Sequence, residues 1–447
     1  SHFIFPDRRI TINLAPADLP KEGGRFDLPI ALGILTASGQ VPQELLAQHE
    51  FLGELALDGG LCAVPGAISA ACAAGLTGRK LVVPADSASL AALAPNSTVI
   101  AAPDLLTLCA HLNGSCPIDR AVPEFAAGDF SYPDLRDVAG QQGARRALEI
   151  AASGSHNLLF SGPPGTGKTL LASRLPGILP PPGPQEALTL MMLRNFFNPA
   201  DKPFESGDYF RRPFRNPHHT ASPAALAGGG SRPRPGEISL AHGGVLFLDE
   251  LAEFSRHSLE VLREPMESGE ITLARARHRN RYPASFQLVA AMNPCPCGYS
   301  GDEQRRCGCT PEQIQRYRAR ISGPLLDRID LQVAVHRLPP GELLNPTANN
   351  ESSSEVRKRV CASREIQIKR QGCANAHLRQ DQLTGICMLE QSDLEYLEVA
   401  AMKMTLSGRA LHRTLRVART IADLAASARV NGEHLCEALA YRGSDKG

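Results

Sequence analysis

The chain has almost no net charge and no uncharged run that suits a membrane. Its 447 residues carry 47 Lys and Arg against 46 Asp and Glu, which leaves a net charge of +1. Because no global field would attract nucleic acid, any such binding must come from local basic patches. The uncharged stretch 59–78 is rich in Ala and Gly and is broken by Pro65, so it indicates buried core rather than a membrane span. No internal repeat and no signal peptide are recognisable.

The remaining composition is that of a soluble globular protein. Hydrophobic residues make up 43% and charged residues 21%, and the length suits two or three domains. Eight of the twelve cysteines are scattered singly, which is typical of reduced thiols, and we therefore expect a cytoplasmic protein. Residues 1–5 enter what reads as the middle of a domain, so we expect a truncated N-terminus or a tag remnant there.

A glycine loop fits the phosphate-loop pattern G-x-x-x-x-G-K-[ST] at every fixed position. It lies between the apolar run 157–160 and the helix-like segment 170–175, which is the context that the motif requires. Its backbone N–H groups and the helix N-terminus favour phosphate oxygens. Lys168 is expected on the β- and γ-phosphates and Thr169 on Mg²⁺. A chance Gly-Pro turn is the alternative. The loop residues are Gly162, Pro163, Pro164, Gly165, Thr166, Gly167, Lys168 and Thr169.

A second motif, residues 243–250, agrees with the first. Its four apolar residues 245–248 predict a strand buried on both faces of a parallel sheet. Asp249 and Glu250 follow at the carboxyl end, where ligands bind in open α/β sheets. Asp249 would hold Mg²⁺, directly or through water, and Glu250 would polarise the attacking water. A solvated loop start is the alternative, but the pairing with the phosphate loop favours nucleotide hydrolysis.

The chain is expected to divide into three domains and a linker. Residues 1–112 form a first unit, and residues 113–133, rich in Pro, Gly and Ala, are the linker. Residues 134–335 alternate strand and helix around both motifs, and residues 336–447 follow as a helical domain after a polar run. Local patterns predict a strand at 9–14, a helix at 28–36, a strand at 81–84 and a helix at 411–424.

The other four cysteines form two C-x-C pairs. They are Cys295, Cys297, Cys307 and Cys309. Four thiolates can close a tetrahedral Zn²⁺ shell, although most zinc knuckles place two residues inside each pair. Disulfides are the alternative, which a cytosolic location disfavours. We expect structural zinc here.

The ATPase core resembles the AAA+ superfamily and, within it, the magnesium-chelatase-like branch that includes the ComM (YifB) family. The segments that carry this resemblance, in addition to the two motifs, are 140–141, 215–222, 235–242, 292–298 and 325–330. It covers almost the whole chain. The resemblance implies a P-loop core with a parallel sheet, an α/β fold, followed by a helical lid. Members of the family are ring-forming ATPases, and ComM is a hexameric helicase that promotes branch migration in natural transformation. We therefore expect ATP and Mg²⁺ as cofactors, a homo-hexamer, single-stranded or branched DNA as partner, and recombination proteins as candidate partners.

The resemblance also assigns roles to single residues. Asn293, after the apolar run 288–292, is expected to be the first sensor, which orients the lytic water, and it also forms an Asn-Pro turn. Arg328 is expected to be the arginine finger that reaches the ATP of a neighbouring subunit; an intrachain ion pair with Asp327 or Asp330 is the alternative. Arg409 is expected to be the second sensor, with Arg413 as the other candidate.

Two segments are candidates for DNA contact. Residues 269–283 predict a hairpin with a basic tip, which in this clade projects into the ring pore; a solvated charged hairpin is the alternative. The long segment between the two motifs, with the basic stretch 211–215 and with His218 and His219, suggests an inserted pore element. The two histidines are also weighed as metal ligands. The basic residues expected to contact DNA are Arg275, Arg277, Arg279 and Arg281.

The first unit resembles the proteolytic domain of Lon, an α+β fold of the ribosomal S5 domain 2 type. Residues 19–27 fall at the nucleophile segment but contain no serine, and residues 57–71 fall at the segment of the base but contain no lysine. Without nucleophile and base, acyl transfer fails, so no protease activity is expected. Two rival functions remain, a magnesium-chelatase ATPase subunit and a scaffold that remodels protein partners.

Overall fold

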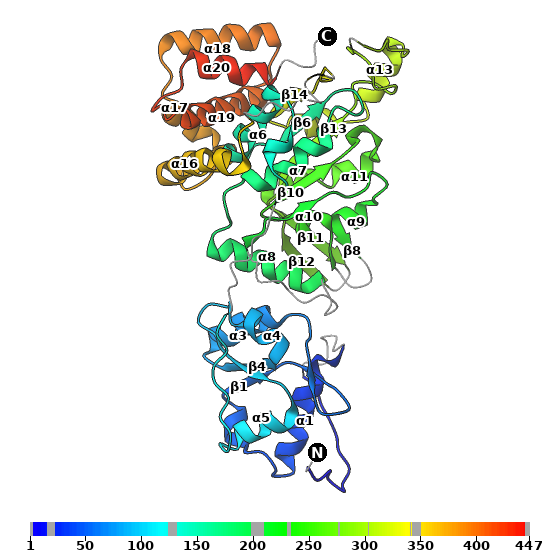
Figure 1. The fold of residues 1–447 in the computed structure, drawn as a ribbon, viewed down its shortest axis with the longest axis vertical. Coiled ribbons are helices and arrows are strands. Elements are labelled where there is room, and N and C mark those ends of the chain that lie inside the picture. The colour runs from blue at the N-terminus through cyan, green and yellow to red at the C-terminus, as the bar shows by residue number, and fades with distance from the viewer. Residues whose placement is uncertain are drawn as a thin grey trace. The chain divides into compact units, whose positions relative to one another are not determined.

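The computed structural model describes residues 3–15, 23–123, 132–197, 210–229, 234–275, 278–302, 304–339, 341 and 350–442, with the backbone alone for 195–197, 274–275 and 278. The chain splits into two compact units (Figure 1). The first comprises Ser1–Phe130 with Pro182–Arg211, and the second comprises Ser131–Pro181 with Arg212–Gly447. The segment 182–211 thus groups with the N-terminal residues, whereas the sequence suggested a continuous ATPase domain over 134–335.

The first unit is built on a parallel sheet of order β1-β4-β5. Its strands are β1 (His49–Phe51), β4 (Lys80–Pro84) and β5 (Thr98–Ala102). Alternate residues of β4 enter separate cores, because Val82 packs with the helices on one face and Leu81 and Val83 with those on the other. The first face carries α1 (Asp27–Ala37) and α5 (Leu105–Leu112), and the second carries α3 (Ala67–Thr77) and α4 (Ala85–Ala91). The predicted helix at 28–36 and strand at 81–84 are confirmed.

A helix from the segment between the two nucleotide motifs completes this unit. Helix α8 (Pro184–Phe197) packs against α3, where Ile68 meets Ala187 and Met191 in a small buried cluster. Shorter elements are α2 (Gln43–Leu46), β2 (Glu54–Leu55) and β3 (Leu61–Cys62), the last two of which pair antiparallel.

The strand predicted at 9–14 is wrong. These residues have no regular secondary structure, and Ile12 is about half exposed. Alternation of polar and apolar residues gives a strand only where a neighbouring strand accepts its hydrogen bonds and a core accepts its apolar face. Among the described residues, neither is provided for this segment.

The second unit is built on a parallel five-stranded sheet of order β14-β6-β13-β10-β7. The strands are β6 (Leu158–Ser161), β7 (Phe214–Arg215), β10 (Val245–Leu248), β13 (Gln287–Met292) and β14 (Leu331–Ala334). All four residues of β10 are buried, as the unbroken apolar run predicts. Val245 and Phe247 enter the core on one face of the sheet, and Leu246 and Leu248 enter the core on the other.

Helices cover both faces of this sheet. One core includes α6 (Gln142–Gly154) and α7 (Lys168–Ile178), and the other includes α10 (Glu237–Leu240) and α11 (Arg256–Glu260). A hairpin of β11 (Glu270–Arg275) and β12 (His278–Pro283) confirms the predicted hairpin. The remaining short elements are α9 (Pro223–Ala227), β8 (Gly228–Gly229), β9 (Arg234–Pro235), α12 (Arg263–Ser268), α13 (Pro311–Arg318) and α14 (Gly323–Leu326).

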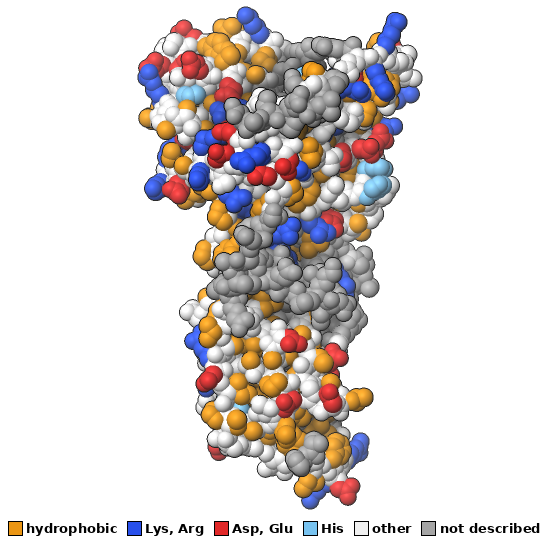
Figure 2. All heavy atoms as spheres, in the orientation of Figure 1, with side chains coloured by type: hydrophobic (Ala, Val, Ile, Leu, Met, Phe, Trp, Pro, Cys, Tyr) orange, Lys and Arg blue, Asp and Glu red, His pale blue; other side chains and the backbone are white. Residues whose placement is uncertain are grey.

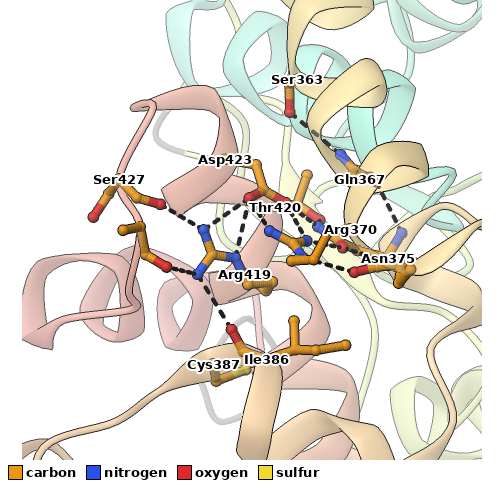
Figure 3. Close-up of polar contacts among 12 residues, drawn as sticks. Ser363, Gln367, Arg370, Asn375, Ile386, Cys387, Arg419, Thr420, Asp423 and Ser427 are labelled. Atoms are coloured by element: carbon orange, nitrogen blue, oxygen red, sulfur yellow. Dashed lines mark hydrogen bonds and ion pairs between the residues drawn. The ribbon is translucent and has the colours of Figure 1, made fainter.

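The C-terminal residues form a helical lid, which we define as residues 350–442. Its helices are α16 (Ser353–Gln371), α17 (Gln380–Cys387), α18 (Gln391–Met404), α19 (Gly408–Leu424) and α20 (Gly432–Ala440). Helix α19 confirms the predicted helix at 411–424 and packs on α6 and α20. A buried polar network lies inside the lid, where Arg419 and Asp423 of α19 meet Arg370 and Asn375 (Figure 3).

The surface of the described residues carries both signs of charge. On the face drawn in Figure 2, Lys and Arg side chains alternate with Asp and Glu rather than forming one basic field. Within the described part of the chain, no helix combines the length and the apolar character needed to cross a bilayer.

Candidate nucleotide site

Three loops with predicted nucleotide-binding residues leave neighbouring strands of one sheet. The phosphate loop follows β6, Asn293 follows β13, and Asp249 with Glu250 follows β10. The three strands are adjacent and parallel, so their carboxyl ends lie at the same edge. The structure thereby brings these predicted residues to one place.

The backbone of the phosphate loop requires glycine at several positions. Gly165 and Gly167 have φ of 78° and 87°, in the left-handed region that residues with a Cβ rarely adopt. Gly162 is excluded from substitution for another reason, because a Cβ there would lie 2.1 Å from the carbonyl oxygen of Val335. The loop then opens into helix α7, which starts at Lys168 and directs its free N–H groups into the loop.

Lys168 is buried and bonds to the loop itself. Its Nζ donates to the carbonyl oxygens of Gly162 at 2.6 Å and Pro163 at 2.8 Å, and to Oδ1 of Asn293 at 3.2 Å. Burial lowers the pKa of Lys168 to about 8, although the nearby carboxylates of Asp249 and Glu250 act in the opposite direction. A phosphate that replaced the two carbonyls would favour the charged ammonium.

The carboxylates at the end of β10 contact both the phosphate loop and a histidine. Thr169 donates its hydroxyl to Oδ2 of Asp249 at 2.7 Å, so the two residues expected to hold Mg²⁺ already touch. Hydroxyl and carboxylate oxygens are the ligands that Mg²⁺ prefers. Glu250 adopts a left-handed φ of 52°, and its Oε2 lies 3.0 Å from Nδ1 of His219.

His219 is a functional candidate that the sequence assigned differently. The sequence suggests a metal ligand or part of a pore element, whereas the ring of His219 lies against Glu250. It is tilted by 34° against the ring of His218, with 4.1 Å between the ring centroids. No metal-ligand group that includes either histidine occurs among the described residues. Because β7 is parallel to β10, the loop after β7 reaches the same sheet edge. Because β7 has only two residues, no periodic sequence pattern predicts it, and the contact between His219 and Glu250 could not be predicted from the sequence.

Asn293 is held from two sides. Its side chain accepts the hydrogen bond from Lys168, and its backbone N–H meets the phenol of Tyr317 in α13. Tyr317 is 5% exposed, and burial raises its pKa to about 12, so it stays a neutral phenol at physiological pH. The predicted sensor therefore lies beside the phosphate loop, in hydrogen-bond contact with Lys168.

The predicted arginine finger and second sensor line a separate cavity. Arg328, Arg409 and Arg413 meet there, with His412 and Arg416 beside them and no phosphate-loop residue in the lining. Arg328 is 7% exposed and pairs with Glu267, not with Asp327 or Asp330. Arg413 donates to Oδ1 of Asp330 at 2.7 Å, whereas Arg409 is exposed. Burial would raise the pKa of Asp330, but His156, Arg413 and Arg442 hold it well below its usual range.

The hairpin places two of the predicted DNA-contacting arginines on one face. Arg279 and Arg281 are two residues apart in β12, and both are exposed. Arg281 lies 4.0 Å from Glu270, a weak exposed pair. Arg277 lies outside the described residues, and only the backbone of Arg275 is described. In the basic stretch 211–215, Arg215 pairs with Glu237 at 2.6 Å, so its charge is compensated within the chain.

The four clustered cysteines converge on one point. Their sulfur atoms all lie within 4.8 Å of one another, and Cys295 Sγ is 3.3 Å from Cys297 and 3.7 Å from Cys307. A tetrahedron with Zn–S bonds of about 2.3 Å has sulfur–sulfur edges of about 3.8 Å, so the residues fit a single zinc ion. The backbone N–H groups of Tyr299 and Gly308 lower the pKa of Cys297 to about 6, whereas desolvation and the neighbouring sulfurs of Cys297 and Cys295 raise the pKa values of Cys307 and Cys309.

Comparison with known proteins gives matches along most of the chain. Residues 134–343 match the family described as "Magnesium chelatase, subunit ChlI", and residues 350–442 match its C-terminal part. Residues 1–87 match "Subunit ChlI of Mg-chelatase".

Individual relatives agree with these families. The chain is 49% identical to the uncharacterized protein YifB of Salmonella typhimurium, over 100% of the chain and 87% of that protein. It is 49% identical to the competence protein ComM of Haemophilus influenzae, over 99% of the chain and 87% of that protein. A weaker similarity, with 25% identity over 36% of the chain and 33% of the other protein, is to Lon protease 2 of Bacillus subtilis. The chain therefore belongs to the magnesium-chelatase-like AAA+ ATPases, in the family that contains YifB and ComM.

Proposed function

We propose that this ATPase is a cytoplasmic homo-hexameric motor that hydrolyses Mg·ATP to move on DNA, with helicase or branch-migration activity in transformation and recombination. The observation that carries the ATPase part is the meeting of Lys168, Asp249, Glu250 and Asn293 at one edge of the parallel sheet. The name of the competence protein ComM, which is similar over nearly the whole chain, supports the biological setting.

The residues at the sheet edge support a division of labour in hydrolysis. Lys168 would exchange its bonds to the Gly162 and Pro163 carbonyls for phosphate oxygens, and Thr169 with Asp249 would hold Mg²⁺. Bound Mg²⁺ would neutralise charge on the β- and γ-phosphates. Glu250 would orient and deprotonate the attacking water, with Asn293 beside it. Replacing Glu250 by Gln keeps the shape and removes the base.

The arginine cavity supports action on a nucleotide bound by another subunit. Arg328, Arg409 and Arg413 gather away from the phosphate loop of their own chain. A cation supplied in trans can raise hydrolysis by about 10³-fold or more. To reach a neighbouring nucleotide, Arg328 would have to break its ion pair with Glu267. Glu267 would then be its partner only when no such nucleotide is contacted.

Subunit mixing tests the trans arrangement. Arg328→Ala and Lys168→Ala subunits should each be inactive alone and should recover part of the ATPase activity when mixed. Some subunit interfaces then combine an intact phosphate loop from one subunit with an intact Arg328 from its neighbour. Arg320→Ala is the matched control, since Arg320 pairs with Glu253 at the surface and lies outside the cavity. If ATPase activity is not recovered at any mixing ratio, Arg328 does not act on the nucleotide of a neighbouring subunit.

The exposed hairpin supports DNA as the substrate. Arg279 and Arg281 would contact phosphates and read no sequence. DNA-stimulated ATPase should then fall steeply with salt, and Arg281→Ala should reduce the slope of log affinity against log salt by about 1. ATPase and unwinding measured on single-stranded, duplex and branched DNA, wild type beside Glu250→Gln, test the proposal as a whole. No stimulation by any DNA would favour a protein-remodelling scaffold.

We also infer structural zinc and an inactive protease-like unit. One zinc per chain in purified protein, reduced in Cys297→Ser, is the expected metal content, and a chain isolated without stoichiometric zinc contradicts it. The segment 57–71 has no lysine to serve as a base, so casein should stay intact. Casein hydrolysis that a Lys168 variant abolishes would contradict this.

A magnesium-chelatase ATPase subunit remains the second candidate, because the descriptions of all three matching families name that subunit. An assay of metal insertion into porphyrin decides between the two. If metal insertion requires this chain and its Glu250, the partner of the ATPase is a chelatase complex and not DNA.

A further inference from the structure

The cysteine cluster adjoins the nucleotide site through the chain itself. Cys295 is fully buried and lies two residues after Asn293, whose side chain accepts a hydrogen bond from Lys168. The intervening residue, Pro294, is buried, and its carbonyl accepts from Arg318 at 3.4 Å. A displacement of Cys295 would therefore be transmitted to Asn293 over two peptide units.

A second contact joins the cluster to the phosphate loop. Gly298 has a left-handed φ of +85°, and a Cβ on it would lie 2.7 Å from Cδ of Pro164 and 3.9 Å from Cγ of Asn293. Its N–H donates to the carbonyl of Cys295 at 3.0 Å, which closes a tight turn between the first two cysteines and this contact. The turn that carries Cys297 thus lies directly against Pro164 in the phosphate loop.

The second cysteine pair continues into the helix that supports Asn293 from the other side. Helix α13 begins directly after Cys309 with a capping box formed by Thr310 and Gln313. Near its end this helix carries Tyr317, whose phenol lies near the backbone N–H of Asn293. The two cysteine pairs therefore come from the two segments that flank the sensor residue.

The segment between the cysteine pairs is ordered by a few side-chain contacts and by the four sulfur atoms. Asp302 pairs with Arg337 at 3.0 Å, and the Arg337 guanidinium lies 5.6 Å from the centroid of the Tyr299 ring. The described residues of 296–310 form neither helix nor strand, and most of them are exposed. A segment without a core of its own is ordered by few contacts, and a metal that joins distant ligands supplies folding free energy directly. The convergence of the four sulfur atoms joins the two ends of this segment.

We propose that a zinc ion held by Cys295, Cys297, Cys307 and Cys309 is a positioning element of the ATPase: it fixes Asn293 and seats Gly298 against Pro164, so that metal occupancy sets the rate of ATP turnover. This rests on the proposed ATP hydrolysis at this site. The cysteines do not touch nucleotide; they act through Asn293 and the phosphate loop. A misplacement of about 1 Å at a catalytic group can lower turnover by about 100-fold.

Two glycines in the segment between the cysteine pairs supply a matched pair of variants. Gly298 and Gly301 both have left-handed φ, +85° and +77°, so alanine strains both backbones. Only Gly298 has a neighbour, because nothing lies within 4 Å of a Cβ on Gly301. Gly298→Ala should lower kcat by about tenfold or more with zinc content unchanged, whereas Gly301→Ala should hydrolyse ATP like wild type. Equal turnover in the two variants would overturn the proposal.

Metal removal gives a readout that does not depend on activity. Hydrogen exchange of intact protein should become faster at residues 163–168 and 292–298 when a chelator removes zinc, return to its initial rate when zinc is restored, and stay constant in β11 and β12. Unchanged exchange at 163–168 after complete zinc loss overturns the proposal, even if the protein proves to have no ATPase activity. Circular dichroism of the metal-free protein separates this local loosening from general unfolding.

Discussion

Removing the carboxylate of Asp423 should destabilise the helical lid strongly. Asp423 is 2% exposed and accepts five hydrogen bonds, from Arg419, Arg370 and Asn375. Arg419 is 1% exposed, and its other donors reach only backbone carbonyls such as that of Ser427, at 2.6 Å (Figure 3). In Asp423→Ala the guanidinium stays buried without a counter-ion.

The expected loss follows from the burial of both partners. Breaking a buried ion pair from one side costs about 3–5 kcal/mol, because the remaining charge keeps its desolvation penalty. The pair of Arg379 and Asp381 is the matched control, since its side chains are 75% and 60% exposed. Asp381→Ala should change the free energy of unfolding by about 1 kcal/mol or less.

Urea unfolding followed by circular dichroism measures both variants. The combined variant Arg419→Met with Asp423→Leu should regain part of the stability, because it leaves no unpaired charge on Arg419. The electrostatic reasoning is refuted if Asp423→Ala and Asp381→Ala unfold at the same urea concentration. It is also refuted if the combined variant is less stable than Asp423→Ala.

Three further predictions concern the nucleotide site. Since burial lowers the pKa of Lys168 to about 8 and bound phosphate would restore its charge, nucleotide affinity should fall as pH rises above that value. Calorimetry should find almost no proton uptake near pH 7, more than half a proton near pH 9, and none in Lys168→Met; equal uptake at both pH values contradicts this. His219→Ala should lower kcat about tenfold with unchanged nucleotide affinity, because Glu250 loses its contact, and His219→Gln should restore part; an unchanged kcat excludes this role. Gly162→Ala should abolish nucleotide binding, since its Cβ would overlap the Val335 carbonyl, and wild-type binding would disprove that steric constraint.

The parts of the fold that the sequence predicts are those specified by short local patterns. The run 245–248 predicts β10 because a strand covered on both faces needs apolar residues at every position. The hairpin of β11 and β12 and the helix α19 are likewise periodic over one element. The segment 9–14 has the same kind of pattern, yet no neighbouring strand among the described residues pairs with it, so the pattern alone was insufficient.

Contacts between distant segments could not be predicted in this way. Helix α8 packs on α3, more than a hundred residues earlier, through apolar residues that would suit many neighbours. His219 contacts Glu250 because the two-residue strand β7 pairs with β10. Gly298 lies against Pro164 because the loops after β13 and β6 leave adjacent strands. Such meetings depend on strand order, which only the three-dimensional structure gives.

The lid and the sheet share one continuous buried cluster. It runs from Val245 and Phe247 of β10 through α6 to Leu415 and Ile421 of α19. A hinge between them would expose this apolar surface to water, so the two parts resist separation. Any conformational change that accompanied hydrolysis would therefore move the sheet and the lid together as one rigid part. Its displacement would be felt at the surfaces of this part rather than inside it.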